Sequence, residues 1–275
     1  MSLPYTDTDD RFKLVAYPAS RIGTIDLGSI GVRKHHVAGF IEVDVTDALR
    51  SLNERAAAGR PVSFFSWMVW TIGACIAEDR EIQAPAGRGR RLVVFEDVDI
   101  TVMVEKTVQG SRVPLPLVVR RVDSRAVEEI DREIRDARRR AVRGETDIVL
   151  SGTRSPGGGL LRLYYRLPAT FRAFLLRRFL RNPFRAKKTM GTVLVTSVAS
   201  AGRVPGWILP RSMHNLCFAL GSVVRKPWVV EDRVEIREIL HMTVLFDHDV
   251  VDGAPAARFI ARLVKRMETR DGAPV

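Results

Sequence analysis

The spacing of apolar and polar positions changes along the chain, and each spacing predicts a different element. Residues 38–49 alternate as a strand does and then continue into a helix that begins near Thr46. The largely apolar segment 63–78 predicts a buried helix with Ser63 as its N-cap residue. Glycine and proline in residues 84–90 predict a break after this helix.

The remaining segments continue this mixture of strands and helices. Residues 91–105 are rich in β-branched side chains and predict one or two strands. Apolar positions at helical spacing predict an amphipathic helix over 124–142. Residues 191–198 predict a buried strand, residues 212–224 another, and residues 234–248 a further strand or a hairpin.

A last helix is predicted after Gly253, with Pro255 in its first turn and an apolar stripe beyond it. Strands and helices are interspersed without a regular strand–helix–strand repeat, and no internal repeat is visible. The sequence therefore predicts a two-layer α/β sandwich with a mixed β-sheet.

The charge of the chain is concentrated in one region. The 275 residues include 44 Lys or Arg and 32 Asp or Glu, a net charge of +12. Residues 148–230 contain 14 basic residues and no acidic one, so the rest of the chain has 30 basic and 32 acidic residues, a net of −2. One segment makes this protein basic.

Other features of the composition indicate a cytoplasmic protein. The sequence has no apolar run of the length that spans a membrane, and its first residues do not resemble a secretory signal. Its two cysteines, Cys75 and Cys217, lie in apolar surroundings. We expect both to be buried free thiols in a reducing compartment.

The segment 244–253 ends an apolar run in a histidine, His248, with three carboxylates close by. The three are Asp247, Asp249 and Asp252. On a strand that ends at His248, the imidazole shares one face with the apolar Val244 and Phe246. Burial there keeps histidine neutral near pH 7 and able to accept a proton. A purely structural histidine occupies such a position equally well, so the spacing alone leaves both roles open.

The heptapeptide DHDVVDG, residues 247–253, resembles the His-x-x-x-Asp-Gly signature of the chloramphenicol acetyltransferase-like fold. More closely, it resembles the catalytic domain of dihydrolipoamide acyltransferases, the core enzymes of 2-oxo acid dehydrogenase complexes. Four other segments follow in the order of that family, so the resemblance extends over most of the chain. They are residues 36–46, 63–84, 97–105 and 191–198.

The resemblance implies that His248 is a general base, which takes the proton from a thiol of coenzyme A or of a dihydrolipoyl group. A base is needed because a thiol of pKa about 8.5 is mostly protonated at neutral pH. The thiolate then attacks a thioester carbonyl, and a strand hydroxyl stabilises the tetrahedral intermediate. Thr196 stands at the matching place, where the family carries a serine, and Ser197 is the second candidate.

The resemblance also gives roles to the other two residues of the signature, Asp252 and Gly253. Asp252 follows His248 by four positions, and Gly253 lets the backbone turn into the last helix. The family pairs this aspartate with an arginine near the N-terminus, for which Arg21 is the first candidate and Arg33 the second. No metal ion is implied.

Three features depart from the family. The catalytic pattern begins near residue 20 without the lipoyl-bearing and subunit-binding domains. We therefore expect no covalently bound lipoyl group, and a lipoyl or acyl carrier domain must act in trans. Asp249 occupies a position where the family usually carries arginine, which removes a positive charge beside the site. Residues 146–189 form a basic insertion, far longer than the connection expected there.

The sequence therefore predicts a single acyltransferase catalytic domain over residues 1–275, with a chloramphenicol acetyltransferase-like fold. It would move an acyl group between coenzyme A and a dihydrolipoyl-type thiol. Because members of this fold build active sites between subunits, we expect a homotrimer or a multiple of it. Two alternatives stay open: an O-acyltransferase acting on a small-molecule hydroxyl, and a catalytically silent scaffold. The combination of His248, Asp252 and Thr196 argues against the scaffold.

The basic insertion allows three interpretations. Pro168 predicts a break, followed by a helix of about three turns from Ala169 to Arg181. This helix could pack on its own domain or on a neighbouring subunit. Residues 160–185 could instead contact anionic lipid, with the protein peripheral at a membrane, or capture an acidic carrier domain. Nucleic acid is not expected, because the aromatic residues lie among aliphatic ones and form no stacking platform.

Overall fold

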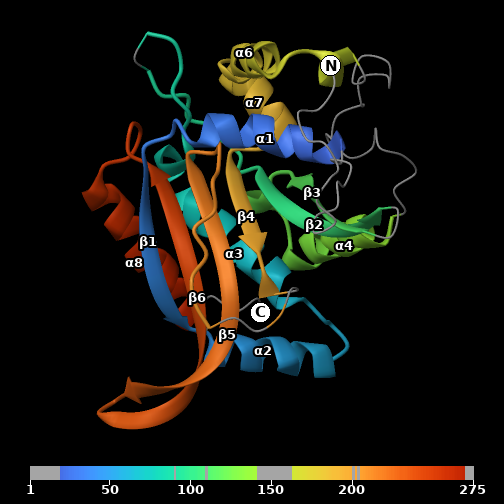
Figure 1. The fold of residues 1–275 in the computed structure, drawn as a ribbon. Coiled ribbons are helices and arrows are strands. Elements are labelled where there is room, and N and C mark those ends of the chain that lie inside the picture. Colours follow the sequence, from blue (N-terminus) through green and yellow to red (C-terminus); the bar gives the residue numbers. More distant parts are fainter. Residues whose placement is uncertain are drawn as a thin grey trace, which may run out of the picture.

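The computed structural model contains one six-stranded mixed sheet (Figure 1). It describes residues 19–89, 91–108, 111–140, 163–199, 202 and 205–269. The strand order is β1-β6-β5-β4-β2-β3. Strand β4 runs parallel to both of its neighbours, and the other pairs are antiparallel. The strands are β1 (His36–Asp44), β2 (Ile100–Val108), β3 (Ser111–Val119), β4 (Val193–Ser197), β5 (Leu216–Val230) and β6 (Arg233–Asp247).

The helices lie mainly on one face of this sheet and at its two ends (Figure 1). The chain order is α1 (Ala19–Gly31), α2 (Thr46–Ala57), α3 (Phe64–Glu78), η1 (Arg80–Gln83), η2 (Val122–Ser124), α4 (Val127–Arg139), α6 (Ala169–Leu180), α7 (Pro183–Met190) and α8 (Gly253–Glu268). Helices α3, α4 and α8 cover one face, and α1 crosses the end of the sheet where β6 finishes.

The core lies between the sheet and helices α3, α4 and α8. Trp67 and Ile72 of α3 are fully buried against alternate residues of the central strands, such as Phe218 and Met242. Helix α8 adds Phe259, whose ring packs edge-on against Phe246. The alternation expected for β6 is confirmed, because Met242, Val244 and Phe246 all belong to this core.

Most elements predicted from periodicity are present. Ser63 caps α3 by accepting a hydrogen bond from the Ser66 amide, and the helices expected after Thr46 and Gly253 both form. Residues 216–247 form a long antiparallel hairpin, in which the two turn residues Glu231 and Asp232 have positive φ. Such a two-residue turn matches the twist of the flanking strands.

Two of the elements that were not predicted are strand β3 and helix α1. Strand β3 contains Pro114 and Pro116, which lack the amide hydrogen that a central strand needs. It forms nevertheless because it is the edge strand and bonds only to β2. The other element is α1, which contains the glycines Gly23 and Gly28 and is therefore a poor helix former by propensity.

The basic insertion forms the outermost layer at one end of the molecule. Helix α6 lies on the far side of α1 from the sheet, and α7 leads from it back to β4 (Figure 1). The break at Pro168 and the helix that follows it are confirmed. Residues 146–162 of the insertion lie outside the described residues.

Candidate active site

His248 stands immediately after the last residue of β6, in a turn over residues 248–250. Its amide donates a hydrogen bond to the carbonyl oxygen of His35 at 2.9 Å. The side chain is exposed, whereas Phe246, two residues earlier, is buried. The expectation of a buried imidazole at the end of the apolar row is therefore wrong. The strand ends one residue earlier than the pattern suggested, and the turn carries His248 out of the core.

Asp247 fixes this turn. Its carboxylate is almost fully buried and accepts from Lys34 Nζ at 2.7 Å. The same ammonium group donates to Asn215 Oδ1 at 2.5 Å. The Asp247 carbonyl accepts the amides of Val250 and Val251, both at 3.0 Å. A buried carboxylate that is paired and bonded in this way holds one geometry, so Asp247 sets the position from which His248 projects.

Asp249 forms a second ion pair at this turn, with His35. The distance from His35 Nδ1 to Asp249 Oδ1 is 2.9 Å, and both side chains are largely exposed. The hydrogen bond that His35 donates to Asp249, followed by the charge of that carboxylate, raises the pKa of His35. The same bond to His35 lowers the pKa of Asp249. Asp249, which stands where arginine was expected from the resemblance, is thus paired with His35. The sequence did not predict this pair.

Asp252 and Gly253 lie at the start of α8. Asp252 occupies the N-cap position, but its exposed carboxylate makes no capping hydrogen bond. Within the residues that the structure describes, no ion pair joins Asp252 to Arg21, which lies near the start of α1. The cation that holds the motif from the N-terminal side is Lys34, and the carboxylate that it holds is Asp247. An Arg21–Asp252 pair stays a prediction.

Thr196 lies in β4, beside Ala219 of β5, which in turn lies beside Thr243 of β6. These three side chains therefore share the sheet face opposite helix α3. Thr243 is four residues before Asp247. At about 3.3 Å per residue and about 4.8 Å per strand, the backbones of Thr196 and Asp247 are about 16 Å apart. One chain alone does not bring Thr196 and His248 to the same reacting carbonyl.

Ser197, the second hydroxyl candidate, is differently engaged. Its Oγ accepts a hydrogen bond from the amide of Ala199 at 3.2 Å, which turns the hydroxyl toward its own loop. For Thr196, no hydrogen bond of the hydroxyl to any described residue is found. The Ser197 hydroxyl is therefore oriented by its own loop, whereas the Thr196 hydroxyl is not.

A cavity of about 350 Å³ lies at the same end of the sheet as the His248 turn. It is lined by α1, α6, α7, residues 83–86, the residues that precede β4 and β5, including Asn215, and Lys34 between α1 and β1. Arg177 and Arg181 contribute positive charge. Gln83 is buried, and its Nε2 has no hydrogen-bond partner in the described structure. A cavity of this size accommodates a small organic molecule and offers it a donor.

His214 forms part of the cavity wall and is buried. Its Nε2 donates to the Met190 carbonyl at 2.7 Å, and its own carbonyl accepts from His36 Nε2 at 2.9 Å. Burial lowers the pKa of His214 to about 4. This histidine is therefore neutral at physiological pH, and the fold uses it to connect β5 to α7 and β1.

The two cysteines are free and buried, as expected. Burial raises the pKa of Cys75 to about 11 and that of Cys217 to about 12. Neither thiol is a nucleophile at neutral pH. Across the described residues, no group of three or more His, Cys, Asp or Glu side chains could hold a metal ion. In the same part of the chain, no helix is long and apolar enough to cross a membrane.

Comparison with known proteins finds a sequence similarity over the part of the chain that contains this site. Residues 191–273, which contain both Thr196 and the His248 turn, match the sequence model of the 2-oxoacid dehydrogenases acyltransferase catalytic domain. The resemblance to that catalytic domain is confirmed. A relative from Acholeplasma laidlawii, the dihydrolipoyllysine-residue acetyltransferase component of its pyruvate dehydrogenase complex, is 32% identical over 77 residues. That match covers 28% of this chain and 14% of the relative.

A longer match is to the lipoamide acyltransferase component of the branched-chain alpha-keto acid dehydrogenase complex of Bacillus subtilis. It is 20% identical and covers 93% of this chain but 55% of the relative. The chain thus spans about half the length, or less, of these two curated relatives.

Solved structures show the same fold over the whole domain. The cubic core of a pyruvate dehydrogenase multienzyme complex superposes with a TM-score of 0.67 at 16% identity, covering 98% of this chain and 97% of that chain. The Azotobacter vinelandii dihydrolipoamide acetyltransferase gives the same TM-score at 18% identity and the same coverage. In that enzyme a serine, a histidine and an asparagine were investigated for their catalytic roles. The predicted α/β fold with a mixed sheet is confirmed, and it is the fold of these acyltransferase cores.

Proposed function

We propose that this chain is an acyltransferase that moves an acyl group between coenzyme A and a dihydrolipoyl-type thiol. The observation that carries the proposal is the His248 turn. Its imidazole is exposed at the end of β6, its backbone is fixed by the buried Asp247–Lys34 pair, and it lies within the segment that matches an acyltransferase catalytic domain.

In the proposed reaction, His248 removes the proton from the acceptor thiol, and the resulting thiolate attacks the thioester carbonyl. The tetrahedral oxyanion accepts a hydrogen bond from Thr196. When the intermediate collapses, the bond from the carbonyl carbon to the sulfur of coenzyme A breaks. The departing thiolate takes the proton back from the imidazolium, so the base is regenerated. A positioned base of this kind contributes about 10² to 10⁴ in rate.

The spacing of the catalytic residues in the Azotobacter enzyme supports Thr196. There the serine precedes the histidine by 52 positions, and the asparagine follows it by four. In this chain, Thr196 precedes His248 by the same interval, 248 − 196 = 52, and Asp252 follows by 252 − 248 = 4. Ser197 would leave an interval of 51.

We propose that the site is shared between copies of the chain in a homotrimer or a multiple of it. The separation of about 16 Å along the sheet, estimated from strand geometry, supports this arrangement. His248 of one copy would meet Thr196 of its neighbour across a head-to-tail interface. Arg21 and Asp252, which are apart within one chain, could pair across the same interface.

The cavity beside Asn215 suits a ligand with an apolar body and anionic groups. Its apolar residues Ile30, Pro85 and Met213 lie together with Arg177 and Arg181. Coenzyme A has both properties, and we propose that part of it binds there. In this proposal the chain is a single catalytic domain, and a lipoyl or acyl carrier domain acts in trans. The buried free thiols support a reducing, cytoplasmic location.

The direct test incubates the protein with a panel of acyl-CoAs and free dihydrolipoamide and measures the release of free coenzyme A. We expect acyl-CoA-dependent release that requires dihydrolipoamide and falls at least about a hundredfold in His248→Ala. A folded His248→Ala protein with wild-type turnover would contradict the proposal. Release stimulated by small-molecule alcohols and not by the dithiol would instead favour the O-acyltransferase.

A further inference from the structure

Helix α6 is attached to the protein through a polar face. The carboxylate of Asp26 in α1 is buried and accepts from Arg172 Nε at 2.9 Å and Nη2 at 3.3 Å. The hydroxyl of Tyr164 donates to the same carboxylate at 2.9 Å. Since a buried carboxylate is costly unless it is paired, this contact determines which side of α6 faces the body.

The orientation of α6 leaves a large part of its apolar side chains exposed. At 100° per residue, one half of the helix carries Phe171, Leu175, Leu176, Phe179 and Leu180. In the structure Phe171, Leu175 and Phe179 are exposed, together with Phe174, while Leu176 and Leu180 are half-buried. The Arg172–Asp26 pair turns the helix, so that the side rich in phenylalanine faces solvent.

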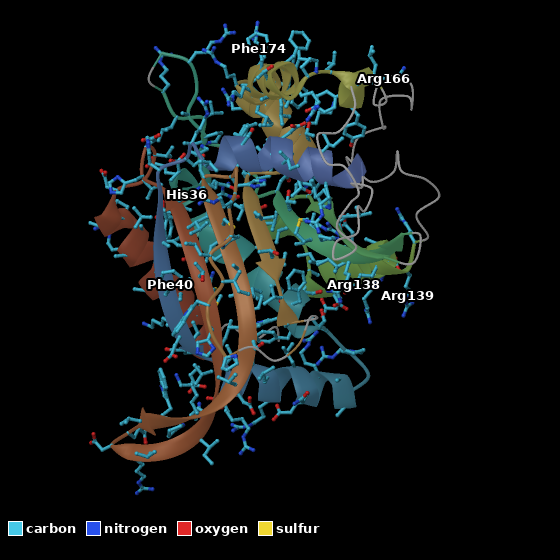
Figure 2. All side chains as sticks on the ribbon, viewed as in Figure 1. His36, Phe40, Arg138, Arg139, Arg166 and Phe174 are labelled. Carbon is cyan, nitrogen blue, oxygen red and sulfur yellow. The ribbon has the colours of Figure 1, made fainter. Side chains whose placement is uncertain are left out.

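The exposed apolar residues continue beyond α6. We define the aromatic face as Leu163, Phe171, Phe174, Leu175, Phe179 and Phe184. The most exposed of these are Phe184, at 64%, and Phe174, at 60%. The rings of Phe171 and Phe174 are stacked, with centroids 6.4 Å apart. Phe174 lies at the outer edge of the molecule (Figure 2). A patch of this kind marks an interaction site.

The charged residues within the segment that carries the aromatic face all have one sign. Its exposed cations are Arg166, Arg178, Arg181, Arg185 and Lys188. Within the described structure, none of these five side chains is in an ion pair. Between residues 148 and 230 the sequence contains no acidic residue that could neutralise them. An anionic partner would complement these cations.

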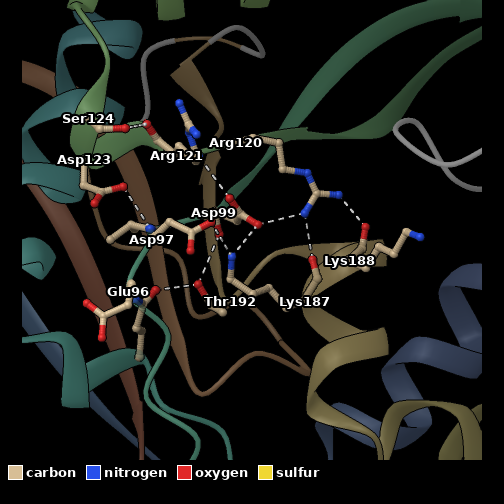
Figure 3. Close-up of polar contacts among 12 residues, drawn as sticks. Glu96, Asp97, Asp99, Arg120, Arg121, Asp123, Ser124, Lys187, Lys188 and Thr192 are labelled. Atoms are coloured by element: carbon tan, nitrogen blue, oxygen red, sulfur yellow. Dashed lines mark hydrogen bonds and ion pairs between the residues drawn. The ribbon is translucent and has the colours of Figure 1, made fainter.

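The surface is also held rigidly. The Lys187 ammonium group, on α7, contacts Asp97 at 3.0 Å and Asp99 at 2.9 Å. The guanidinium group of Arg120 bonds the same Asp99 at 2.8 Å and the Lys187 carbonyl at 2.9 Å, which secures the end of α7 (Figure 3). The insertion is thus anchored at Asp26 and at Asp99, so the aromatic face is presented in a fixed geometry.

We propose that the aromatic face docks on an anionic lipid bilayer. A helix with phenylalanine and leucine on its outer side and arginine beside them lies in the headgroup region with its apolar side chains inserted. A symmetric contact between two copies of this chain, with this face on both sides, would oppose like charges. An acidic protein would satisfy the arginines but would need a matching apolar groove for five or six bulky side chains. A bilayer satisfies both demands.

The test is vesicle co-sedimentation of the full chain, with phosphatidylcholine vesicles that contain or lack phosphatidylglycerol. We expect binding only to the anionic vesicles and weaker binding at high salt. Phe171→Ser combined with Phe174→Ser should abolish sedimentation. The matched control is Phe40→Ser, because Phe40 is 52% exposed but lies on β1, away from α6 (Figure 2).

A second pair of variants tests the charge. Arg178→Gln should weaken binding about fivefold, which corresponds to about 1 kcal/mol for one cation near an anionic surface. Arg233→Gln, at the far tip of the β5–β6 hairpin, should leave binding unchanged. All variants replace exposed residues and should unfold at the wild-type temperature.

Three results would overturn the proposal. The first is equal binding to neutral vesicles, and the second is unchanged binding of the double phenylalanine variant. The third is no binding by the wild type, with loss of an oligomer in the double variant by light scattering, which would assign the face to a protein contact. Vesicle binding is measured without substrate, so its outcome is independent of acyltransferase activity.

Discussion

His214 should make the protein acid-sensitive, because the folded state resists its protonation. The imidazole is 6% exposed, its Nε2 donates to the Met190 carbonyl, and its Nδ1 lies 3.3 Å from the Ser212 hydroxyl. The neutral ring is therefore fully bonded. Burial lowers its pKa to about 4, and the nearby charges of Lys34 and His36 act in the same direction. A histidine in the unfolded chain titrates near 6.5.

The sign of the effect follows from proton binding. Below pH 6.5 the unfolded chain binds a proton at His214 that the folded protein does not bind until the pH falls to about 4. The stability that this site contributes is therefore fully present above pH 6.5. It is lost as the pH falls from 6.5 to about 4. A pKa difference of about 2.5 corresponds to about 3 kcal/mol, most of which is lost by about pH 4.5.

The assay compares wild type with His214→Gln, which cannot titrate in this range. Urea unfolding followed by circular dichroism at neutral pH and near pH 4.5 gives the loss of stability of each protein. Carboxylates with lowered pKa values, such as those of Asp44 and Asp97, contribute equally to both and cancel. Wild type should lose about 2 to 3 kcal/mol more than the variant. Equal losses would refute the assignment of a buried, neutral His214.

Three further changes have defined expected effects. Lys34→Met leaves the buried Asp247 carboxylate unpaired and should cost about 3 kcal/mol in urea unfolding, with reduced acyl transfer; an unchanged midpoint would show that the pair is not needed. Gly191→Ala should cost more than about 2 kcal/mol in the same assay, because φ is 63° and a Cβ would lie 2.6 Å from the Asp99 carbonyl oxygen. Thr196→Ala should lower kcat with little change in KM, whereas Thr196→Ser should retain most activity; loss of activity in Ser197→Ala alone would move the donor by one residue.

The sequence predicted the elements whose patterns depend on the core. Alternation identified β1 and β6, helical periodicity identified α4 and α8, and largely apolar segments identified α3 and β4, because all of them contribute to the same core. It missed β3, since two prolines disqualify a strand unless its edge position is already known. It missed α1 because its glycines lower the helix propensity of this segment, and the helix depends on tertiary contacts.

The sequence motif predicted which residues form the candidate site, and the structure showed which residues hold them in place. The signature placed His248, Asp252 and Gly253 at one turn, but the turn is held by Asp247 and Lys34, 213 positions apart in sequence. No local pattern marks such a pair. The orientation of α6 was likewise set by the contact of Arg172 with Asp26, 146 positions away. Periodicity describes each helix alone and contains no information about such distant partners.

Mixing two inactive variants tests the central claim most directly. His248→Ala and Thr196→Ala subunits are co-expressed in equal amounts, and acyl-CoA-dependent release of coenzyme A is measured for the mixture and for each variant alone. If each site takes His248 from one copy and Thr196 from its neighbour, about a quarter of the sites in the mixture are intact. The account predicts recovery of about a quarter of wild-type activity. No recovery above the separate variants, in a mixture shown to be co-assembled, would contradict it.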